Sequence, residues 1–249
     1  MTGSSASAFN ASDTSASDPR GELAALGLRD VHLWLCSRDR VASSDDFKRR
    51  VLSRYAAVAP GDWQFTSNAG GKPVLAGAAC ALDFNLSHSG DWLACAVTGG
   101  TPVGVDLEYC HPDRATMKLA RRFFRQEEVA ALQDCSEALQ RDRFYDYWTL
   151  KEAAVKARGQ TLVPGLQARG FELTFPAGPE SGTGRIAVTT EAMADAAHYC
   201  LLDPLAAYRV AICWLPATPV LPQLQVFELR AGEEVMELIV PVRASSAAD

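Results

Sequence analysis

Histidine, paired cysteines and long apolar runs are what this 249-residue sequence has least of. Its four histidines show no metal-ligand spacing, and its seven cysteines are odd in number, scattered and without a C-x-x-C pair. This usage argues against a zinc site and a disulfide framework, and it fits a reducing cytoplasm. No run approaches the roughly 18 apolar residues of a transmembrane helix, and the chain opens without a basic and apolar secretory leader.

Positive charge is also in deficit, since the formal net charge is −6. We therefore expect neither nucleic acid nor membrane as a partner, and any phosphate site must be a local basic pocket. The hydrophobic content of 48% is enough for a sizeable core in one large domain or two small ones. We expect a cytoplasmic monomer.

Composition divides the chain into four segments. Residues 1–29 are rich in Ser, Ala, Asp and Gly and are predicted to be a disordered tail. Gly99-Gly100-Thr101-Pro102 is the best boundary inside the rest. It separates an N-terminal subdomain, residues 30–101, from a C-terminal subdomain, residues 102–215. Residues 216–249 look like a peripheral extension with one further strand.

The predicted elements indicate an α+β fold. YRVAIC at 208–213 echoes WLACAV at 92–97, which suggests two tandem, similar subdomains, each a small antiparallel sheet packed with helices. The expected strands are 31–36, 63–66, 82–86, 92–97, 103–108, 171–175, 186–189, 199–202, 208–214 and 226–229, and the expected helices are 45–55, 114–124, 127–139 and 144–158.

One helix carries the first chemical signal, FYDYWTLKEAAVKARG at 144–159. Gly159 is a natural stop, and the aromatic and aliphatic residues form a buried stripe at helical spacing. Glu152 and Lys156 are four residues apart, so a carboxylate and an ammonium share one helix face. Alone, such a pair is most often an ordinary surface ion pair.

The second signal is VGVDLE at 103–108, which reads as a strand. Asp106 and Glu108 are two residues apart and project from the same side of it. Two such carboxylates favour a cation between them, and Mg²⁺ takes carboxylate oxygens with water and substrate phosphate. A strand edge with solvated acids remains the alternative.

Together these motifs resemble the paired signatures of the 4′-phosphopantetheinyl transferases of the larger, pseudo-dimeric Sfp-type class. The resemblance rests on G-V-D-L-E, on W-T-L-K-E-A-A-V-K-A-R-G, on G-K-P at 71–73 and on F-N-L-S-H-S-G at 84–90. It implies Mg²⁺-dependent transfer of 4′-phosphopantetheine from coenzyme A to a serine of an apo acyl, peptidyl or aminoacyl carrier protein, with release of 3′,5′-ADP.

The resemblance also implies roles for individual residues. Glu152 and Lys156 would be catalytic. Mg²⁺ would be held by Asp106, Glu108 and Glu152, and a basic patch of Arg121, Arg122 and Phe124 would meet the acidic carrier protein. The coenzyme A contacts would be Arg40, Lys72, Pro73, Ser87, His88, Asp106 and Lys156.

Two alternatives stay open. Ser87-His88-Ser89-Gly90 reads as a tight phosphate-binding loop, whereas a Ser/His hydrolase lacks its G-x-S-x-G elbow and a nearby acid. The family has a longer segment, including a helix, between the first strand and its coenzyme-binding arginine, and here Ser37 and Arg38 lead almost directly to Arg40. The alternative function is therefore a catalytically weak module that binds coenzyme A or a carrier protein.

Overall fold

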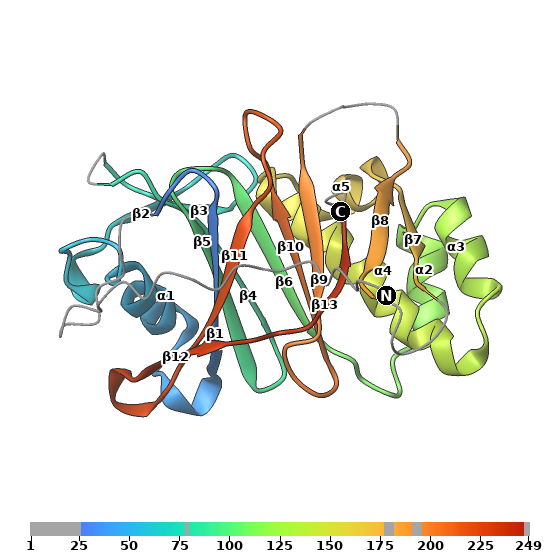
Figure 1. Cartoon of the computed structure of the whole chain (residues 1–249), viewed down its shortest axis with the longest axis horizontal. Helices are drawn as coiled ribbons and strands as arrows, with labels where there is room; N and C mark the ends of the chain where they lie inside the picture. Colours follow the sequence, from blue (N-terminus) through green and yellow to red (C-terminus); the bar gives the residue numbers. More distant parts are fainter. Residues whose placement is uncertain (1–25, 78–79, 177–181, 191–195, 247–249) are drawn as a thin grey trace, which may run out of the picture.

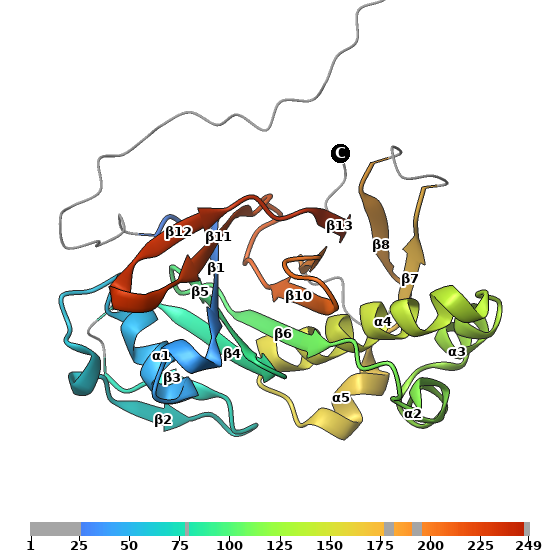
Figure 2. The same ribbon diagram turned by 90° about the horizontal axis from the view of Figure 1, so that it is seen from below.

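The computed structural model describes residues 26–77, 80–176, 182–190 and 196–246. The tail predicted for residues 1–29 falls outside this range except for its last four residues. Two large sheets stand side by side, and helices cover their outer faces (Figures 1 and 2). Within the described ranges, no helix has the length and apolar character needed to cross a bilayer.

The N-terminal sheet has the strand order β12-β11-β1-β5-β4. Its outer face buries Trp34, Phe84 and Leu93 against Phe47 and Val51 of the helix α1. A two-stranded hairpin, β2 and β3, lies beside it. The bounds are β1 Asp30–Ser37, α1 Ser44–Leu52, β2 Phe65–Ser67, β3 Pro73–Leu75, β4 Asp83–Ser89, β5 Trp92–Thr98, β11 Gln223–Leu229 and β12 Val235–Leu238.

The C-terminal sheet has the order β6-β10-β9-β13-β8-β7. The long helix α4 packs on its outer face through a second core that includes Phe144, Leu150 and Ala153. The bounds are β6 Val103–Tyr109, α2 Thr116–Phe123, α3 Gln126–Gln133, α4 Glu137–Ala157, α5 Leu162–Ala168, β7 Phe171–Thr174, β8 Gly184–Val188, β9 His198–Leu202, β10 Tyr208–Trp214 and β13 Val242–Ser245.

The two halves repeat one connectivity, which confirms the predicted α+β fold. In each half a strand is followed by its covering helix and then by a hairpin whose second strand pairs with the first. The elements are β1, α1, β4 and β5 in one half and β6, α4, β9 and β10 in the other. The weak echo between WLACAV and YRVAIC is therefore structural, since β5 and β10 occupy the same place in their sheets.

The central helix is longer than its sequence pattern indicated. The expected helix over 127–139 ends at Gln133, and α4 begins at Glu137. It ends at Ala157, and Gly159 follows at φ +56, a left-handed conformation that suits glycine. Buried residues occur all around the second half of α4, because α2, α3 and α5 cover the sides that the sheet leaves open.

Residues 216–249, which we expected to be a peripheral extension, supply strands to both sheets. β11 pairs in parallel with β1 and antiparallel with β12, and β13 pairs antiparallel with β9 and in parallel with β8. The sheets are therefore mixed, and not purely antiparallel as predicted. In Figure 1 this red segment runs across both sheets, from β12 to β13.

Candidate functional site

The edge strands β4 and β6 bring the two halves together at the site. β4 presents polar side chains to β6, and main-chain N–H groups of β6 donate to them. Val103 N lies 3.1 Å from Asp83 Oδ1, and Val105 N lies 2.9 Å from Asn85 Oδ1. The constant offset of 20 residues means that β4 and β6 run in parallel, joined through side chains in place of a backbone ladder.

Gly104 sets how closely α4 approaches β6. A Cβ atom at Gly104 would lie 2.1 Å from Ala153 O and 2.4 Å from Ala157 N, both in the backbone of α4. Only glycine allows this contact. The first residue of the G-V-D-L-E motif is therefore explained by packing, and the packing places Glu152 and Lys156 beside Asp106.

Lys156 bridges the two acidic motifs. Its Nζ lies 2.6 Å from Asp106 Oδ1 and 3.8 Å from Glu152 Oε2, and it also donates to Ser87 Oγ at 3.1 Å. Asp106 is only 3% exposed. Its Oδ1 accepts a second hydrogen bond from Ser87 Oγ at 2.9 Å, whereas its Oδ2 is buried and has no hydrogen-bond partner among the described residues.

Glu108 is held by three donors, one from α4, one from β4 and one from the connection between β6 and α2. Trp148 Nε1 of α4 lies 3.0 Å from its Oε1, Ser89 Oγ of β4 lies 3.0 Å from its Oε2, and Arg114 Nη1 lies 3.3 Å from the same Oε2. The guanidinium of Arg114 also lies 5.0 Å from the ring of Trp148. The carboxylate is therefore fixed in direction.

Burial and the neighbouring charges shift the pKa values of Glu108, Glu152 and Lys156. Burial raises the pKa of Glu152 to about 7, and the nearby charge of Asp106 adds to the shift. Burial and Asp106 also raise the pKa of Glu108. Burial opposes the charge of Lys156, but Asp106 and Glu152 outweigh it and raise the pKa of its ammonium. Two carboxyl groups thus contact the Lys156 ammonium, and the charge of Glu108 acts on it from further away.

The residues fit a hard divalent cation by donor chemistry. Carboxylate oxygens from a strand and a helix converge, and a buried oxygen without a hydrogen bond, such as Asp106 Oδ2, calls for a cationic or polar partner. In the arrangement described, Lys156 stands between Asp106 and Glu152. Among the described residues, no three acidic, histidine or cysteine side chains form a closed metal-ligand set as they stand.

The G-K-P loop contacts the end of α4. A Cβ atom at Gly70 would lie 1.8 Å from Gly159 O, so loop and helix end touch through glycines. Lys72 is 9% exposed, and its Nζ donates to Asp83 Oδ1 at 2.6 Å and to Val103 O at 2.9 Å. Pro73 begins β3 and is exposed. The ammonium of Lys72 is therefore engaged in joining the two halves.

Ser87 and His88 do not lie in the loop that the sequence predicted. β4 continues through Ser89, and the turn to β5 falls at Gly90 and Asp91. The strand persists because its backbone pairs with β5 as far as Trp92. Since side chains alternate along a strand, Ser87 projects toward Asp106, whereas the exposed His88 lies on the other face.

Arg40 lies apart from the acidic group. Its guanidinium is about half exposed, pairs with Asp39 at 3.3 Å and lines an open hollow with Trp92 and Arg230. Two other basic side chains are also engaged, since Arg50 of α1 and Arg54 just after it bind the carboxylate of Glu233. The structure thus shows no gathered basic pocket among these residues.

The predicted carrier-protein patch divides into exposed and buried members. Arg121 and Arg122 at the end of α2 are exposed. Phe124 is 5% exposed and stacks on Phe144 at 5.3 Å, so it belongs to the core. Phe123 is the partly exposed ring, with the guanidinium of Arg122 5.0 Å from its centroid.

Sequence reasoning missed Asp83, Arg114 and Trp148 as parts of this site. Trp148 had a signal, because it precedes Glu152 by one helical turn and so shares its face. Arg114 and Asp83 had no such signal in the sequence, because the segments that they contact come close only in the folded protein.

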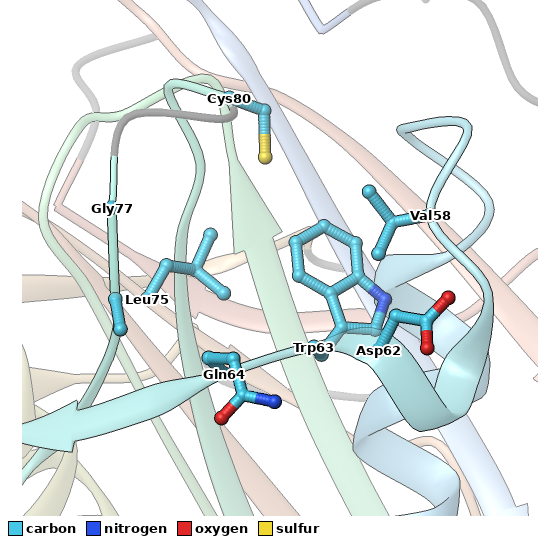
Figure 3. A pocket seen from close by; sticks show the side chains of 8 residues that line it. Val58, Asp62, Trp63, Gln64, Leu75, Gly77 and Cys80 are labelled. Carbon is cyan, nitrogen blue, oxygen red and sulfur yellow. The ribbon is translucent and has the colours of Figure 1, made fainter.

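A separate pocket lies in the N-terminal half (Figure 3). Trp63, Leu75 and Cys80 line it with Val58 and Gln64, and its empty volume is about 350 Å³. Burial raises the pKa of the Cys80 thiol, which makes it a poorer nucleophile. None of the acidic residues of the site lines this pocket.

Comparison with known proteins agrees with this arrangement. Residues 102–213 match the family model described as the 4′-phosphopantetheinyl transferase superfamily. A 127-residue segment, 50% of this chain, is 38% identical to 54% of the 4′-phosphopantetheinyl transferase HetI from Nostoc. The Sfp transferase of Bacillus subtilis is 34% identical over 49% of this chain and 53% of its own length.

A further relative extends the match. The 4′-phosphopantetheinyl transferase psf-1 of Bacillus pumilus is 32% identical over 165 residues, 66% of each chain. The chain spans about half the length of the first curated relatives that it matches. The matched segment includes β6, α4 and β10, which carry and support the acidic group. Through this segment, the chain belongs to the 4′-phosphopantetheinyl transferase superfamily and resembles its Sfp-type members.

Proposed function

We propose that this protein transfers 4′-phosphopantetheine from coenzyme A to a serine of an apo carrier protein and releases 3′,5′-ADP. One observation carries the proposal: the Lys156 ammonium lies between Asp106 and Glu152, so the strand motif and the helix motif form one site. The relatives that match this segment are named 4′-phosphopantetheinyl transferases, which supports the proposal.

The site suits phosphoryl transfer, in which positioning and charge neutralisation do most of the work. In the proposed step, the serine oxygen forms a bond to the β-phosphorus of the coenzyme pyrophosphate. The bond from that phosphorus to the bridging oxygen breaks, and 3′,5′-ADP leaves with the electron pair. Glu152 accepts the serine proton, and Lys156 stabilises the charge that develops on the leaving phosphate.

Mg²⁺ is the cofactor that this donor set fits. Asp106, Glu108 and Glu152 would hold it, with Asp106 Oδ2 as an oxygen that has no hydrogen-bond partner in the described part of the chain. When bound, the ion would neutralise charge on the pyrophosphate oxygens. Trp148 and Arg114 keep Glu108 pointing into this group.

The remaining coenzyme contacts are proposed for the N-terminal half. His88 is exposed on the outer face of β4 and is the proposed partner of the 3′-phosphate. Arg40, Lys72 and Pro73 stay as predicted contacts of the nucleotide portion. Lys72 would act largely through its loop, because its ammonium already binds Asp83 and Val103 O.

The proposed partner is an acidic carrier protein. Arg121 and Arg122 are exposed at the end of α2, with the partly exposed Phe123 beside them. An acidic helix would find complementary charge there, and such pairs mainly affect association rate and specificity. Fatty acid, polyketide, nonribosomal peptide and amino-acid carrier proteins are all compatible with this charge.

Mass spectrometry of intact carrier proteins tests the proposal. Several apo carriers are incubated with the protein, coenzyme A and Mg²⁺, and the expected result is the phosphopantetheine mass increment on one serine. Asp106→Ala should abolish the increment while the variant stays folded. Chelation of Mg²⁺ should do the same for the unchanged protein, and full transfer in either case would refute the metal role.

The alternative is a catalytically weak module that binds coenzyme A or a carrier protein. One observation favours it: Arg50 of α1 and Arg54 just after it are paired with Glu233, and Arg40 lies in a separate hollow. Coenzyme A binding by calorimetry, together with no mass increment on any carrier at prolonged incubation, would select this alternative.

A further inference from the structure

The S-H-S and D-L-E segments face each other in register. Ser87 Oγ donates to Asp106 Oδ1 at 2.9 Å, and two residues on, Ser89 Oγ donates to Glu108 Oε2 at 3.0 Å. Both pairs follow the two-residue period of a strand, and β4 and β6 run in parallel. Each hydroxyl of one strand therefore meets one carboxylate of the other.

The hydroxyl of Ser87 has no proton left to donate to a ligand oxygen such as that of a phosphate. It donates its proton to Asp106 and accepts from Lys156 Nζ, and its residue is only 7% exposed. Ser87, Lys156 and Asp106 Oδ1 thus form a closed triangle of hydrogen bonds. The triangle uses one carboxylate oxygen of Asp106 and leaves Oδ2, which is buried and to which no described residue donates a hydrogen bond.

Ser89 is used in the same way. Its hydroxyl donates to Glu108 Oε2 and accepts from Tyr109 N at 3.0 Å, so it links the carboxylate to the backbone of β6. Glu108 is thereby fixed from β4, while Trp148 fixes its other oxygen from α4.

His88, between the two serines, lies on the opposite face. Its strand partner on β5 is Leu93, whose side chain belongs to the core under α1, whereas the partner of Ser87 is Ala94 on the inner face. Three consecutive residues therefore serve two different sides of β4.

From this geometry we propose that Ser87 and Ser89 are positioning residues that orient the carboxylates of Asp106 and Glu108 for a divalent cation. They act through those carboxylates and do not contact the coenzyme phosphate. The inference rests on the proposed function for the identity of the cation. The S-H-S motif then has two roles: the two serines orient the carboxylates, and His88 is the residue of the motif that is proposed to bind the 3′-phosphate.

Loss of such an outer hydrogen bond typically lowers metal affinity about 10- to 100-fold. We expect Ser87→Ala to weaken Mn²⁺ binding by about that factor, measured by electron paramagnetic resonance of free Mn²⁺ without coenzyme or carrier. Ser89→Ala should cause a smaller loss, because Trp148 and Arg114 still hold Glu108. Ser89→Thr keeps the hydroxyl and should restore the affinity.

His88→Ala is the matched control on the same strand. It should leave Mn²⁺ affinity unchanged and should reduce the preference for coenzyme A over dephospho-coenzyme A, measured by calorimetry. Ser87→Ala should show the reverse pattern, with that preference intact. The Ser87→Ala/Ser89→Ala double variant should lose Mn²⁺ affinity most, and its far-ultraviolet circular dichroism and unfolding midpoint verify the fold.

Unchanged Mn²⁺ affinity in a folded Ser87→Ala/Ser89→Ala variant would overturn the inference, as would loss of the 3′-phosphate preference in Ser87→Ala. Failure of the proposed function would look different. In that case the unchanged protein would bind no Mn²⁺, or would bind it and still give no mass increment on a carrier.

Discussion

At the scale of single residues, Gly104 determines the geometry of the site more than any acidic residue does. An alanine methyl there would enter the backbone of α4 at Ala153 and Ala157, and a backbone cannot rotate away as a side chain can. We predict that Gly104→Ala destabilises the protein by about 1–3 kcal/mol, the usual cost of overpacking. It should also separate Glu152 from Asp106 and lower any transferase activity.

Urea unfolding and a carrier-modification assay measure both effects. Gly61→Ala is the matched control, since a Cβ atom at Gly61 would meet nothing within 4 Å. That variant should keep its stability within about 0.5 kcal/mol and its full activity. A Gly104→Ala variant as stable and active as the control would show that α4 does not depend on this contact.

His32 allows a prediction of pH dependence. Burial lowers its pKa from 6.5 to about 4, with Asp30 and Gln225 opposing, and its Nδ1 lies 2.8 Å from the hydroxyl of Tyr55. The unfolded chain therefore gains a proton at a higher pH than the folded chain does. Stability from this group is complete above about pH 6.5 and falls as the pH drops toward 4.

The non-titrating variant His32→Gln should lack that part of the pH dependence. Between pH 7.5 and 5, the free energy of unfolding of the unchanged protein should fall by roughly 2 kcal/mol more than that of His32→Gln. Urea titrations at several pH values measure the difference. Parallel curves for the two proteins would mean that the pKa of His32 is the same in the folded and the unfolded chain.

At the scale of elements, the buried pair of Lys151 and Glu128 holds three helices together. Lys151 Nζ on α4 lies 2.8 Å from Glu128 Oε2 on α3 and also donates to two main-chain oxygens, Leu166 O in α5 and Arg169 O just after it. Burial lowers the pKa of Lys151, while Glu128 opposes that shift. The first lysine of the K-E-A-A-V-K motif is thus a packing residue.

We predict that Lys151→Met destabilises the protein by about 3–5 kcal/mol, because Glu128 would stay buried with its charge uncompensated. Lys118→Met, the same change at an exposed position of α2, should cost less than about 0.5 kcal/mol. Urea unfolding measures the loss of stability in each of the two variants. Wild-type stability of Lys151→Met with lost activity would instead make this lysine a catalytic group.

The elements that sequence patterns predicted well are those whose signal is local. β6 and α4 have strong strand and helix patterns, and both motifs lie on them as expected. β4 was cut short, because its extension through Ser89 depends on pairing with β5. The sequence also did not indicate which of Phe123 and Phe124 is buried. Two adjacent aromatic residues point to different sides, and the side that is buried depends on how the rest of the chain packs.

At the scale of the whole molecule, the C-terminal segment ties the two halves to one another. Its first strand, β11, pairs with β1, from which it is separated by almost the entire chain. Such pairing leaves no local pattern, and the strands β12 and β13 are four residues each. The sequence therefore predicted a peripheral extension for a segment that supplies strands to both sheets.

The same segment contacts the covering helix of each half. Glu233, in the turn between β11 and β12, binds Arg50 and Arg54 of the N-terminal half at 2.8 and 2.7 Å. Arg243 of β13 binds the buried Asp146 of α4 through its Nε at 2.9 Å. Because α4 also carries Glu152 and Lys156, the C-terminal segment contacts the same helix that supplies these two site residues.

Deletion of residues 218–249 should therefore abolish cooperative folding. It would remove the parallel partner of β1, expose Trp34 by loss of its stacked ring Phe227, and break the contact of Arg243 with Asp146. Ile239→Ser is the matched change within the segment, since that side chain is fully exposed, and its effect should stay within about 0.5 kcal/mol. Circular dichroism during heating compares the two proteins. A truncated chain that unfolds cooperatively at the original midpoint would show that each half holds its own sheet together, and the acidic site would then have to be assembled without this connection.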